Sequence, residues 1–552
     1  MEQTRMIIAV VLSVIILILW NLFFVHNKPV NQAVEEKSNL KTVEKTEKKV
    51  ETPPTQAEIA QKNTEPDDSE KNVAPEIITV NTALYQVRIS EQGAAFKSFQ
   101  LKAYRETLEK DSPPKELIDP ENTTGTVLNG FVGDSVPGIS KAVYTAEIDS
   151  DEITVTDQTV TIPFLWRSRD GVIIEKEYTF FPDSYKIGLN VKVDNRSRAA
   201  IQDQMTLSMR NTLPGKSSRY GFTGPSAMVN NQVQEIKPKK LEEKNQFSGN
   251  ISWAAFQDLY FMSSIIPTQE EESTVEFLIK DQNFVESKIV LPKANIQPAS
   301  VAVFKFQVYF GPKSITILKT MGHRLEKVVD FGWFDPIARP CLWVMNWLYH
   351  YIPNYGVAII LLTIFIKILL WPLGNKSYKS MSQMKKMQPL MADIRERYKD
   401  DKQKMNIELM SLYKTYKVNP LGGCLPMIAQ MPVFFAFYRM LYQAVELRHA
   451  PFMGWINDLS APDRLFNFGV HIPFMHPPYG IPVLTIIMGA TQLIQQKMQP
   501  PAGDPAQAKM MMLMPIFFTV IFVNFPSGLV LYWLVNNILN ILQQYYVNKK
   551  TA

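Results

Sequence analysis

The stretch YGVAIILLTIFIKILLWPL (355–373) carries a single charged residue, Lys367, which lies twelve residues after Tyr355 and six before Leu373. Nineteen helical residues rise about 28 Å, which is close to the roughly 30 Å hydrocarbon core of a bilayer. The stretch therefore predicts a membrane-spanning helix with a cation well inside it.

Other apolar runs lie on both sides of this helix. A run of 20 residues at 6–25 ends in Trp and Phe, which is typical of an uncleaved signal anchor rather than a cleaved signal peptide. Further candidate spans follow at 420–442, 479–498, 510–525 and 528–547. The run at 510–525 gives only about 24 Å of helix, which indicates missed residues at its start or a locally thinned bilayer. We predict a multi-pass α-helical membrane protein with six spans, whose last five form a core over 355–547.

The chain between the anchor and the core divides into three parts. Residues 27–75 contain no aromatic side chain and are rich in Lys, Glu, Thr and Pro, which predicts a disordered tether. Residues 76–320 alternate apolar and polar side chains, as in YKIGLNVKVD (185–194), and indicate a large all-β sandwich. Residues 324–352 mix aromatic side chains with prolines and charges, which favours an amphipathic helix at the membrane surface.

The charge of the loops predicts the topology. Residues 374–419 contain eleven Lys and Arg against five Asp and Glu, so the positive-inside rule places this loop in the cytoplasm. With six spans, both termini are then cytoplasmic and residues 26–352 are periplasmic. The expected location is the inner membrane of a bacterium.

Lys367 is the first candidate functional residue. A cation at mid-membrane costs about 2.5–3.5 kcal/mol on insertion scales and usually faces water or a partner. The alternative is that its long stem carries the ammonium to the membrane surface. Spacing alone leaves both interpretations open.

Uncharged polar residues in the other spans support a hydrated interior. Thr363 lies one turn before Lys367, and Gln430 lies in the next span. Asn536, Asn540 and Gln543 repeat at i, i+4 and i+7 and so share one helix face. Because these spans contain no Asp or Glu, the pattern favours a cavity that attracts anions over a proton or cation pathway.

The cytoplasmic loop at 376–418 is expected to form a helical hairpin that turns at Asp400 and Asp401. Met381, Met384 and Met391 keep helical spacing in its first arm. They are either the core of the hairpin or a flexible surface for varied apolar segments.

Catalysis is not indicated. The sequence has no nucleotide-binding glycine loop, no metal-ligand spacing and no histidine between residues 27 and 322, so we expect no cofactor and no metal. Its two cysteines exclude a disulfide framework, and a net charge of +5 does not argue for nucleic acid.

Three long motifs carry a family resemblance. NPLGGCLPMIAQMPVFFAFYRML (419–441), VELRHAPF (445–452) and FPSGLVLYWLVNNILNILQQ (525–544), together with the span that bears Lys367, closely resemble the YidC insertases of Gram-negative bacteria. The resemblance is close over 355–547 and architectural elsewhere. It implies a membrane protein insertase and chaperone, acting alone or with the Sec translocon, whose hydrophilic groove is open to cytoplasm and lipid.

The resemblance also implies roles for particular residues and partners. Lys367 matches a groove position at which many relatives carry Arg. The expected groove and substrate-contact residues are Thr363, Gln430, Met431, Phe434, Tyr532 and Trp533, and the face with Asn536 and Asn540 joins them. Implied partners are nascent membrane proteins, the Sec translocon with its accessory subunits, lipids, and the ribosome through the cytoplasmic loops. The β-domain resembles the galactose-mutarotase-like sandwich, although its lack of histidine argues against that activity.

Two other classes of protein remain as alternatives. A secondary transporter would need carboxylates in its spans and usually an internal repeat, and neither is visible in this sequence. A membrane-anchored periplasmic carbohydrate-binding protein would need only the first span.

Overall fold

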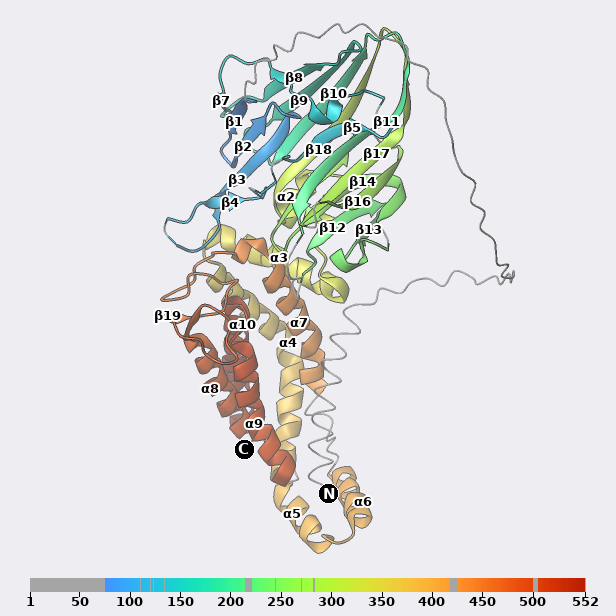
Figure 1. Ribbon diagram of the computed structural model, residues 1–552. Helices are drawn as coiled ribbons and strands as arrows, with labels where there is room; N and C mark the ends of the chain where they lie inside the picture. Colours follow the sequence, from blue (N-terminus) through green and yellow to red (C-terminus); the bar gives the residue numbers. More distant parts are fainter. Residues whose placement is uncertain are drawn as a thin grey trace, which may run out of the picture. The chain divides into compact units, whose positions relative to one another are not determined.

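The computed structural model describes residues 75–551, except positions 110, 120, 123, 134, 214–220, 244, 270, 281–282, 417–424 and 500–504 (Figure 1). The chain divides between residues 72 and 73 into two units, and the described residues belong to the second. The predicted span at 6–25 and nearly all of the predicted tether at 27–75 lie outside the described residues.

Two mostly antiparallel β-sheets form the first half of the described chain. A five-stranded sheet has the order β4-β3-β2-β1-β7, and a 13-stranded sheet runs β5-β11-β17-β16-β14-β15-β18-β10-β9-β8-β6, with β12 and β13 attached to β14. Their bounds are β1 (Ile77–Asn81), β2 (Tyr85–Ser90), β3 (Ala95–Arg105), β4 (Pro114–Glu116), β5 (Leu128–Phe131), β6 (Thr145–Ala146), β7 (Glu152–Thr154), β8 (Val160–Arg167), β9 (Val172–Phe180), β10 (Lys186–Asn195), β11 (Ile201–Thr212), β12 (Gly224–Val229), β13 (Gln232–Glu235), β14 (Gln246–Gln257), β15 (Phe261–Pro267), β16 (Glu272–Lys280), β17 (Phe284–Ile296) and β18 (Ser300–Pro312).

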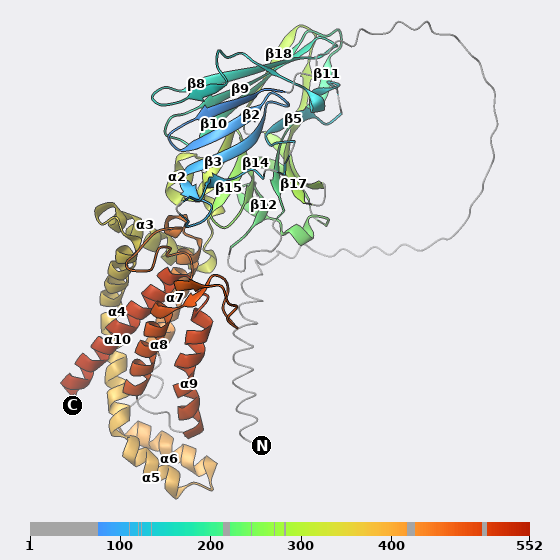
Figure 2. The ribbon, with the colours of Figure 1, turned by 60° about the vertical axis from the view of Figure 1, so that its left-hand side comes forward.

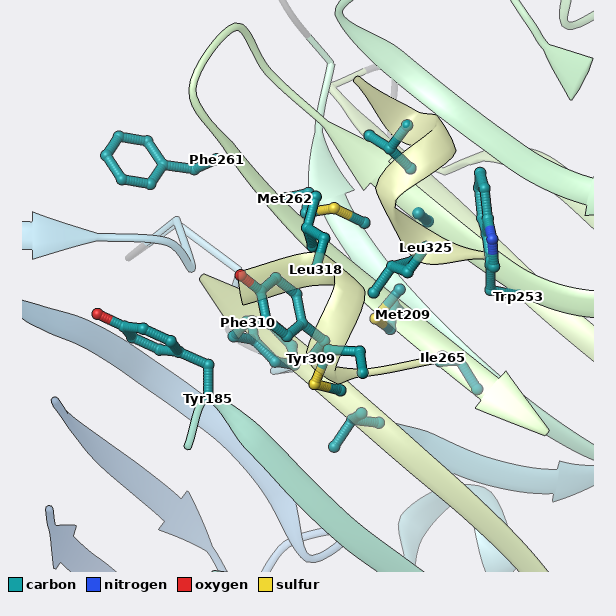
Figure 3. Close-up of a cluster of buried hydrophobic side chains, with 14 of the residues drawn as sticks. Tyr185, Met209, Trp253, Phe261, Met262, Ile265, Tyr309, Phe310, Leu318 and Leu325 are labelled. Carbon is teal, nitrogen blue, oxygen red and sulfur yellow. The ribbon is translucent and has the colours of Figure 1, made fainter. Parts of the chain in front are cut away.

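The two sheets bury a shared aromatic core. Every second side chain of β9 and β10 is buried, as the alternation in the sequence predicts. Phe99 of β3 stacks on Phe310 of β18 with ring centroids 4.9 Å apart, so the small sheet packs on the large one. Figure 3 shows the end of this core, where Leu318 and Leu325 from the short helices α2 (Ile315–Thr320) and η3 (Leu325–Val328) lie among strand side chains.

Lys176 of β9 is fully buried inside this sandwich. Its ammonium donates hydrogen bonds to the backbone carbonyls of Gly93 (2.9 Å), Ala94 (3.1 Å) and Val127 (2.9 Å). It also lies 5.3 Å from the ring centroid of Tyr178. This lysine therefore ties the chain segments before β3 and before β5 to strand β9 of the large sheet.

The buried lysines predict a rise of stability with pH. Burial lowers the pKa of Lys176 to about 7 and that of Lys313 to about 8, whereas a lysine in the unfolded chain titrates near 10.4. At a pH between the folded and the unfolded pKa, each of these lysines is protonated in the unfolded chain and largely neutral in the folded chain. The free energy of unfolding therefore increases with pH, by up to about 1.4 kcal/mol per pH unit for each lysine. We expect a higher urea midpoint at pH 9 than at pH 7, measured by pulse proteolysis of the detergent-solubilised protein. A flat midpoint would contradict this linkage.

Helices make up the second half of the chain. Their bounds are η4 (Gly332–Phe334), α3 (Asp335–Tyr351), α4 (Tyr355–Lys386), α5 (Gln388–Arg397), α6 (Lys402–Thr415), α7 (Leu425–Gln443), η6 (Val445–Leu447), α8 (Val483–Met498), α9 (Pro505–Phe522) and α10 (Ser527–Thr551), with a hairpin of β19 (Leu465–Phe468) and β20 (Tyr479–Ile481) between η6 and α8. Figures 1 and 2 show α5 and α6 at one end of the helices and α3 and β19 at the other.

Several boundaries differ from those predicted. The predicted helix at 324–352 begins only at Asp335, because Gly332 adopts a positive φ of 65° and Pro336 favours the first turn. The predicted span at 479–498 begins at Val483, since residues 479–481 pair as strand β20 and Pro482 precedes the helix. The short span at 510–525 gains residues at its start, because α9 begins at Pro505.

The helix that carries Lys367 is longer than predicted. It continues beyond Leu373, through Pro372, to Lys386, so the predicted membrane span and the first part of the predicted loop are one element. Among the described helices this is the only one that is both long and apolar enough to cross a membrane by itself, and Lys509–Phe522 is a shorter apolar helix. The predicted hairpin at 376–418 therefore consists of the end of α4, α5 and α6.

The methionines of the hairpin have different surroundings. Met391 is buried with Met387 against Leu409, Leu412 and Tyr413, so it belongs to the core of the α5–α6 hairpin. Met381 and Met384 lie instead on the extension of α4.

Candidate functional site

Lys367 points into the helices rather than toward an end of α4. Only 7% of the residue is exposed, and its ammonium donates to Asn540 Oδ1 of α10. The hydroxyl of Tyr378, three turns further along α4, donates to the same oxygen at 3.3 Å. The amide of Asn540 therefore holds the ammonium in place without neutralising it.

A cavity of about 90 Å³ opens beside this group. Helices α4, α7, α8 and α10, with Gln499 directly after α8, contribute its walls. The lining residues are Lys367, Leu370, Leu373, Gly374, Ser377, Tyr378, Met381, Gln430, Gln495, Gln499 and Asn540. None of them is acidic, and α4, α7, α8, α9 and α10 contain no Asp or Glu anywhere in their sequences. Polar and apolar side chains thus both line the cavity, which has one fixed positive charge and no carboxylate.

Amide side chains of α10 connect it to three other helices. Gln430 Nε2 of α7 donates to Asn536 Oδ1 at 2.9 Å, and Asn537 Nδ2 donates to Thr491 Oγ1 of α8 at 3.2 Å. Gln543 Nε2 donates at 3.0 Å to the Trp371 carbonyl of α4. The predicted i, i+4, i+7 face of α10 therefore lies inside the bundle.

Thr363 does not reach the cavity. It is buried, and its hydroxyl donates to the Ile359 carbonyl one turn earlier at 2.6 Å, so its polar group is satisfied within its own helix. The structure places it one turn from Lys367 without joining the two.

The predicted aromatic contact residues gather in a separate cluster. The rings of Phe434 and Trp533 meet edge to face with centroids 4.5 Å apart, and Phe437 stacks on Tyr532 at 4.6 Å. Tyr532 is almost completely buried, whereas 41% of Met431 is exposed. Of the predicted groove residues, Lys367, Gln430 and Asn540 therefore line the cavity, whereas Phe434, Tyr532 and Trp533 form an aromatic wall on α7 and α10.

Sequence reasoning missed Tyr378, Ser377 and Gln499 as cavity residues. For the first two the reason is the helix end: the predicted span stops at Leu373, and α4 instead continues to Lys386. With a continuous helix, Tyr378 lies eleven residues after Lys367, which is three turns and therefore on the same face.

The β-domain contains a second cavity, of about 370 Å³, between β3–β4 and β11–β15. Its carboxylates already have partners within the chain. Glu106 pairs with Lys115 at 3.0 Å, and Asp119 accepts from the Thr212 hydroxyl at 2.5 Å. Glu116 accepts from the backbone amide of Phe99 at 2.6 Å. In the part of the chain that the structure describes, no group of three His, Cys, Asp or Glu residues is arranged to hold a metal ion.

Comparisons with known proteins give a consistent result over both halves of the chain. The family model of the YidC periplasmic domain matches residues 77–344, and that of the 60Kd inner membrane protein matches residues 347–552. The membrane protein insertase YidC of Syntrophus aciditrophicus (strain SB) is 41% identical, with 99% of each chain covered. The one from Syntrophobacter fumaroxidans is 42% identical, over 85% of this chain and 86% of its own.

Solved structures are less similar to this chain than these relatives are. A crystal structure of an active YidC insertase with its first transmembrane domain resolved is 18% identical, covers 86% of this chain and 95% of its own, and has a TM-score of 0.37. A galactose mutarotase-like protein from Lactobacillus casei is 12% identical over 42% of this chain and 99% of its own, with a TM-score of 0.31. The galactose-mutarotase-like form of the β-domain stays a prediction. The family models and the full-length relatives place this chain in the family of YidC membrane protein insertases, with a periplasmic domain before its helical core.

Proposed function

We propose that this protein inserts apolar segments of nascent inner-membrane proteins through the polar cavity around Lys367. The observation that carries the proposal is a buried cation with an amide partner, in a cavity without carboxylates. A cation held in this way attracts anions, and an acidic segment of a substrate is the anion that an insertase meets.

The proposed arrangement has six spans, as the sequence predicts, with α4, α7, α8, α9 and α10 crossing the inner membrane. Large apolar side chains on α4, α8 and α9 support it because they are exposed in the folded chain. They are Phe365, Ile368 and Leu369 on α4, Ile486, Ile487 and Ile494 on α8, and Met512, Leu513, Ile516, Phe517 and Val520 on α9. Soluble proteins rarely expose contiguous apolar surface of this extent. Helix α8, with 16 residues, rises only about 24 Å, so we infer a bilayer thinned around the site.

Topology follows from the charged hairpin. With α5 and α6 in the cytoplasm, both termini are cytoplasmic and residues 26–352 are periplasmic. Helix α3 then lies in the periplasmic surface of the membrane, since its buried face (Ala338, Cys341, Leu342, Met345) alternates with an exposed stripe of Trp343, Trp347 and Tyr351. Tryptophan and tyrosine prefer this boundary between water and lipid.

The mechanism assigns separate tasks to the cavity and the aromatic wall. Lys367 attracts an acidic polar tail of the substrate. The amides of Gln430, Asn536 and Asn540 replace part of the hydration of this tail and so lower the free-energy cost of moving the tail across the membrane. The wall with Phe434 and Trp533 offers apolar contact to the transmembrane part of the substrate. Apolar partitioning and the membrane potential, about 2.3 kcal/mol per charge per 100 mV, supply the driving force.

The partners proposed for this activity are those of an insertase. Nascent membrane proteins are the substrates, and the Sec translocon with its accessory subunits is the proposed companion for larger ones. The basic hairpin of α5 and α6 and the other cytoplasmic loops would meet the ribosome, whose surface RNA is anionic.

The test is genetic complementation. A bacterial strain depleted of its own insertase receives this protein, and insertion of a small single-span substrate with an acidic tail is scored by protease protection. Rescue supports the proposal. Failure by a protein that is expressed and present in the membrane would contradict it and favour a transporter or a carbohydrate-binding protein.

Asn540→Asp tests whether the net charge of the cavity matters. The substitution keeps the size of the side chain and its contact with Lys367, but it converts a cation held by an amide into a neutral ion pair. We expect insertion of the acidic-tailed substrate to fall at least about tenfold, the change that 1.4 kcal/mol produces. Asn540→Gln, which stays neutral, is the control. Equal insertion by the Asp variant and the wild type would show that contact geometry, not charge, is what Lys367 contributes.

A further inference from the structure

The chain between η6 and α8 forms a hairpin of β19 and β20 whose apolar side chains point outward. Phe466, Val470 and Phe474 are 68%, 71% and 85% exposed, and Phe468 and Ile481 are also exposed. Between Arg464 and Lys497 the chain carries no Asp, Glu, Lys or Arg. An exposed loop in water is usually polar, so this composition requires an explanation.

The hairpin is held firmly in its exposed position. Arg464 donates to the Pro478 carbonyl at 2.9 Å and to the Val523 carbonyl, directly after α9, at 2.8 Å. Asn524 donates to the Phe474 carbonyl at 2.7 Å and accepts from the His476 amide at 2.7 Å. The backbone next to Phe474 is thus tied to the end of α9, and the ring remains outside.

The helix that follows the hairpin, α8, indicates what covers the hairpin. Only Pro482 separates β20 from α8, whose exposed Ile486 and Ile487 begin within the next two turns. The hairpin is therefore followed directly in the chain by a helix with exposed apolar side chains, which the proposed arrangement places in lipid. The hairpin also lies at the same end of the helices as α3 with its exposed tryptophans (Figures 1 and 2).

We infer that the β19–β20 hairpin is a second membrane-surface anchor, inserted into the periplasmic leaflet through Phe466, Val470 and Phe474. Its partner is the lipid surface. The absence of charged side chains in the hairpin fits the headgroup boundary, where phenylalanine partitions favourably and no specific ion pair is needed. Anchors at α3 and at the hairpin would fix the periplasmic ends of α4 and α8 at a set depth. The inference rests on the proposed membrane arrangement, in which α8 and α9 span the bilayer.

The experiment measures the depth of single labelled sites in the full-length protein, reconstituted in nanodiscs. In a Cys341→Ala, Cys424→Ala background, Val470→Cys and, separately, Phe474→Cys are labelled with bimane. Quenching is compared among phospholipids that carry a nitroxide on the headgroup, at acyl carbon 5 or at acyl carbon 12. Ile487→Cys on α8 is the control for membrane depth, and Val132→Cys, exposed in the β-domain, is the control for water.

We expect the hairpin labels to lose roughly half or more of their emission with the headgroup and carbon-5 nitroxides and little with carbon 12, as for a side chain 5–10 Å into the interface. Ile487→Cys should respond to the nitroxides on the acyl chain, and Val132→Cys to none. Quenching of Ile487→Cys without quenching of either hairpin label would overturn the inference and leave the proposed arrangement standing. If Ile487→Cys is not quenched either, the arrangement itself fails.

A second variant separates lipid from a protein partner. Phe474→Asp in the Val470→Cys protein should reduce lipid quenching about twofold or more because a charge opposes insertion, whereas Phe474→Leu should retain it. Nanodiscs that hold one copy of the protein exclude coverage by a second copy. Hairpin labels that are shielded from water-soluble iodide but insensitive to every lipid nitroxide would show that protein, not lipid, covers the hairpin, and would refute the inference.

Discussion

Lys367→Ala is expected to abolish insertion of a small acidic-tailed substrate, and Lys367→Arg is expected to retain it. In a partly hydrated protein environment two unit charges 4 Å apart interact by up to about 4 kcal/mol. Loss of half of that attraction already lowers the rate more than about tenfold. The Ala variant also removes the Lys367 donor of the Asn540 oxygen, which then keeps only the Tyr378 hydroxyl of these two.

The expected behaviour of Arg follows from the geometry of the contact. A single amide oxygen accepts from Lys367, and Tyr378 shares that oxygen, so no second acceptor in this contact demands the planar fork of a guanidinium. Arg keeps the positive charge and can donate to the same oxygen. We therefore expect its insertion rate to stay within about threefold of wild type, well short of the tenfold change that 1.4 kcal/mol would cause.

Lys367→Met separates charge from packing. Methionine keeps most of the apolar stem and removes the ammonium, so a protein that needs only the stem would still insert its substrate. The measurement is protease protection in the depleted strain, with equal membrane levels of each variant verified by immunoblot. If the Met and Ala variants insert as well as wild type, Lys367 is an internal structural residue and the charge hypothesis is wrong.

Lys176→Met is expected to destabilise the β-domain by about 3 kcal/mol. The substitution leaves three buried carbonyls, of Gly93, Ala94 and Val127, without their donor. Each unsatisfied group costs about 1–3 kcal/mol, and the sum is partly offset because an ammonium no longer has to be buried.

A lysine on the neighbouring strand provides the matched control. Lys192 of β10 pairs with Glu175 at 3.2 Å and is 43% exposed, so Lys192→Met should change the free energy of unfolding by less than about 0.5 kcal/mol. Urea midpoints from pulse proteolysis compare the two variants with wild type. The Lys176 variant should also lose much of the increase between pH 7 and pH 9. If its midpoint equals that of wild type, water has replaced the ammonium at the three carbonyls.

The sequence alone predicted the kinds of elements correctly wherever one physical signal dominates. Alternation in 185–194 predicted buried and exposed faces that β10 shows residue by residue. The i, i+4, i+7 spacing of Asn536, Asn540 and Gln543 placed them on one face, because 3.6 residues per turn leaves no other arrangement.

Helix ends were less predictable because local stop signals compete with the packing of the helix against its neighbours. Pro372 is a strong stop signal, yet α4 passes through it and continues to Lys386. Loss of one backbone hydrogen bond is tolerated where neighbouring helices hold the element by packing. The same reasoning missed Tyr378, which only the continuous helix brings to Lys367.

The sequence by itself determined the periodicities, the position of the one cation in an apolar run and the family motifs, since these are properties of neighbours along the chain. Only the tertiary structure decided which amide receives the Lys367 ammonium, which carbonyls hold Lys176 and which side chains of the 465–482 hairpin remain outside. Asn540 lies 173 residues from Lys367, and Gly93 lies 83 residues from Lys176. Contacts across such separations follow from how faces pack, and local spacing carries no information about which distant face a side chain will meet.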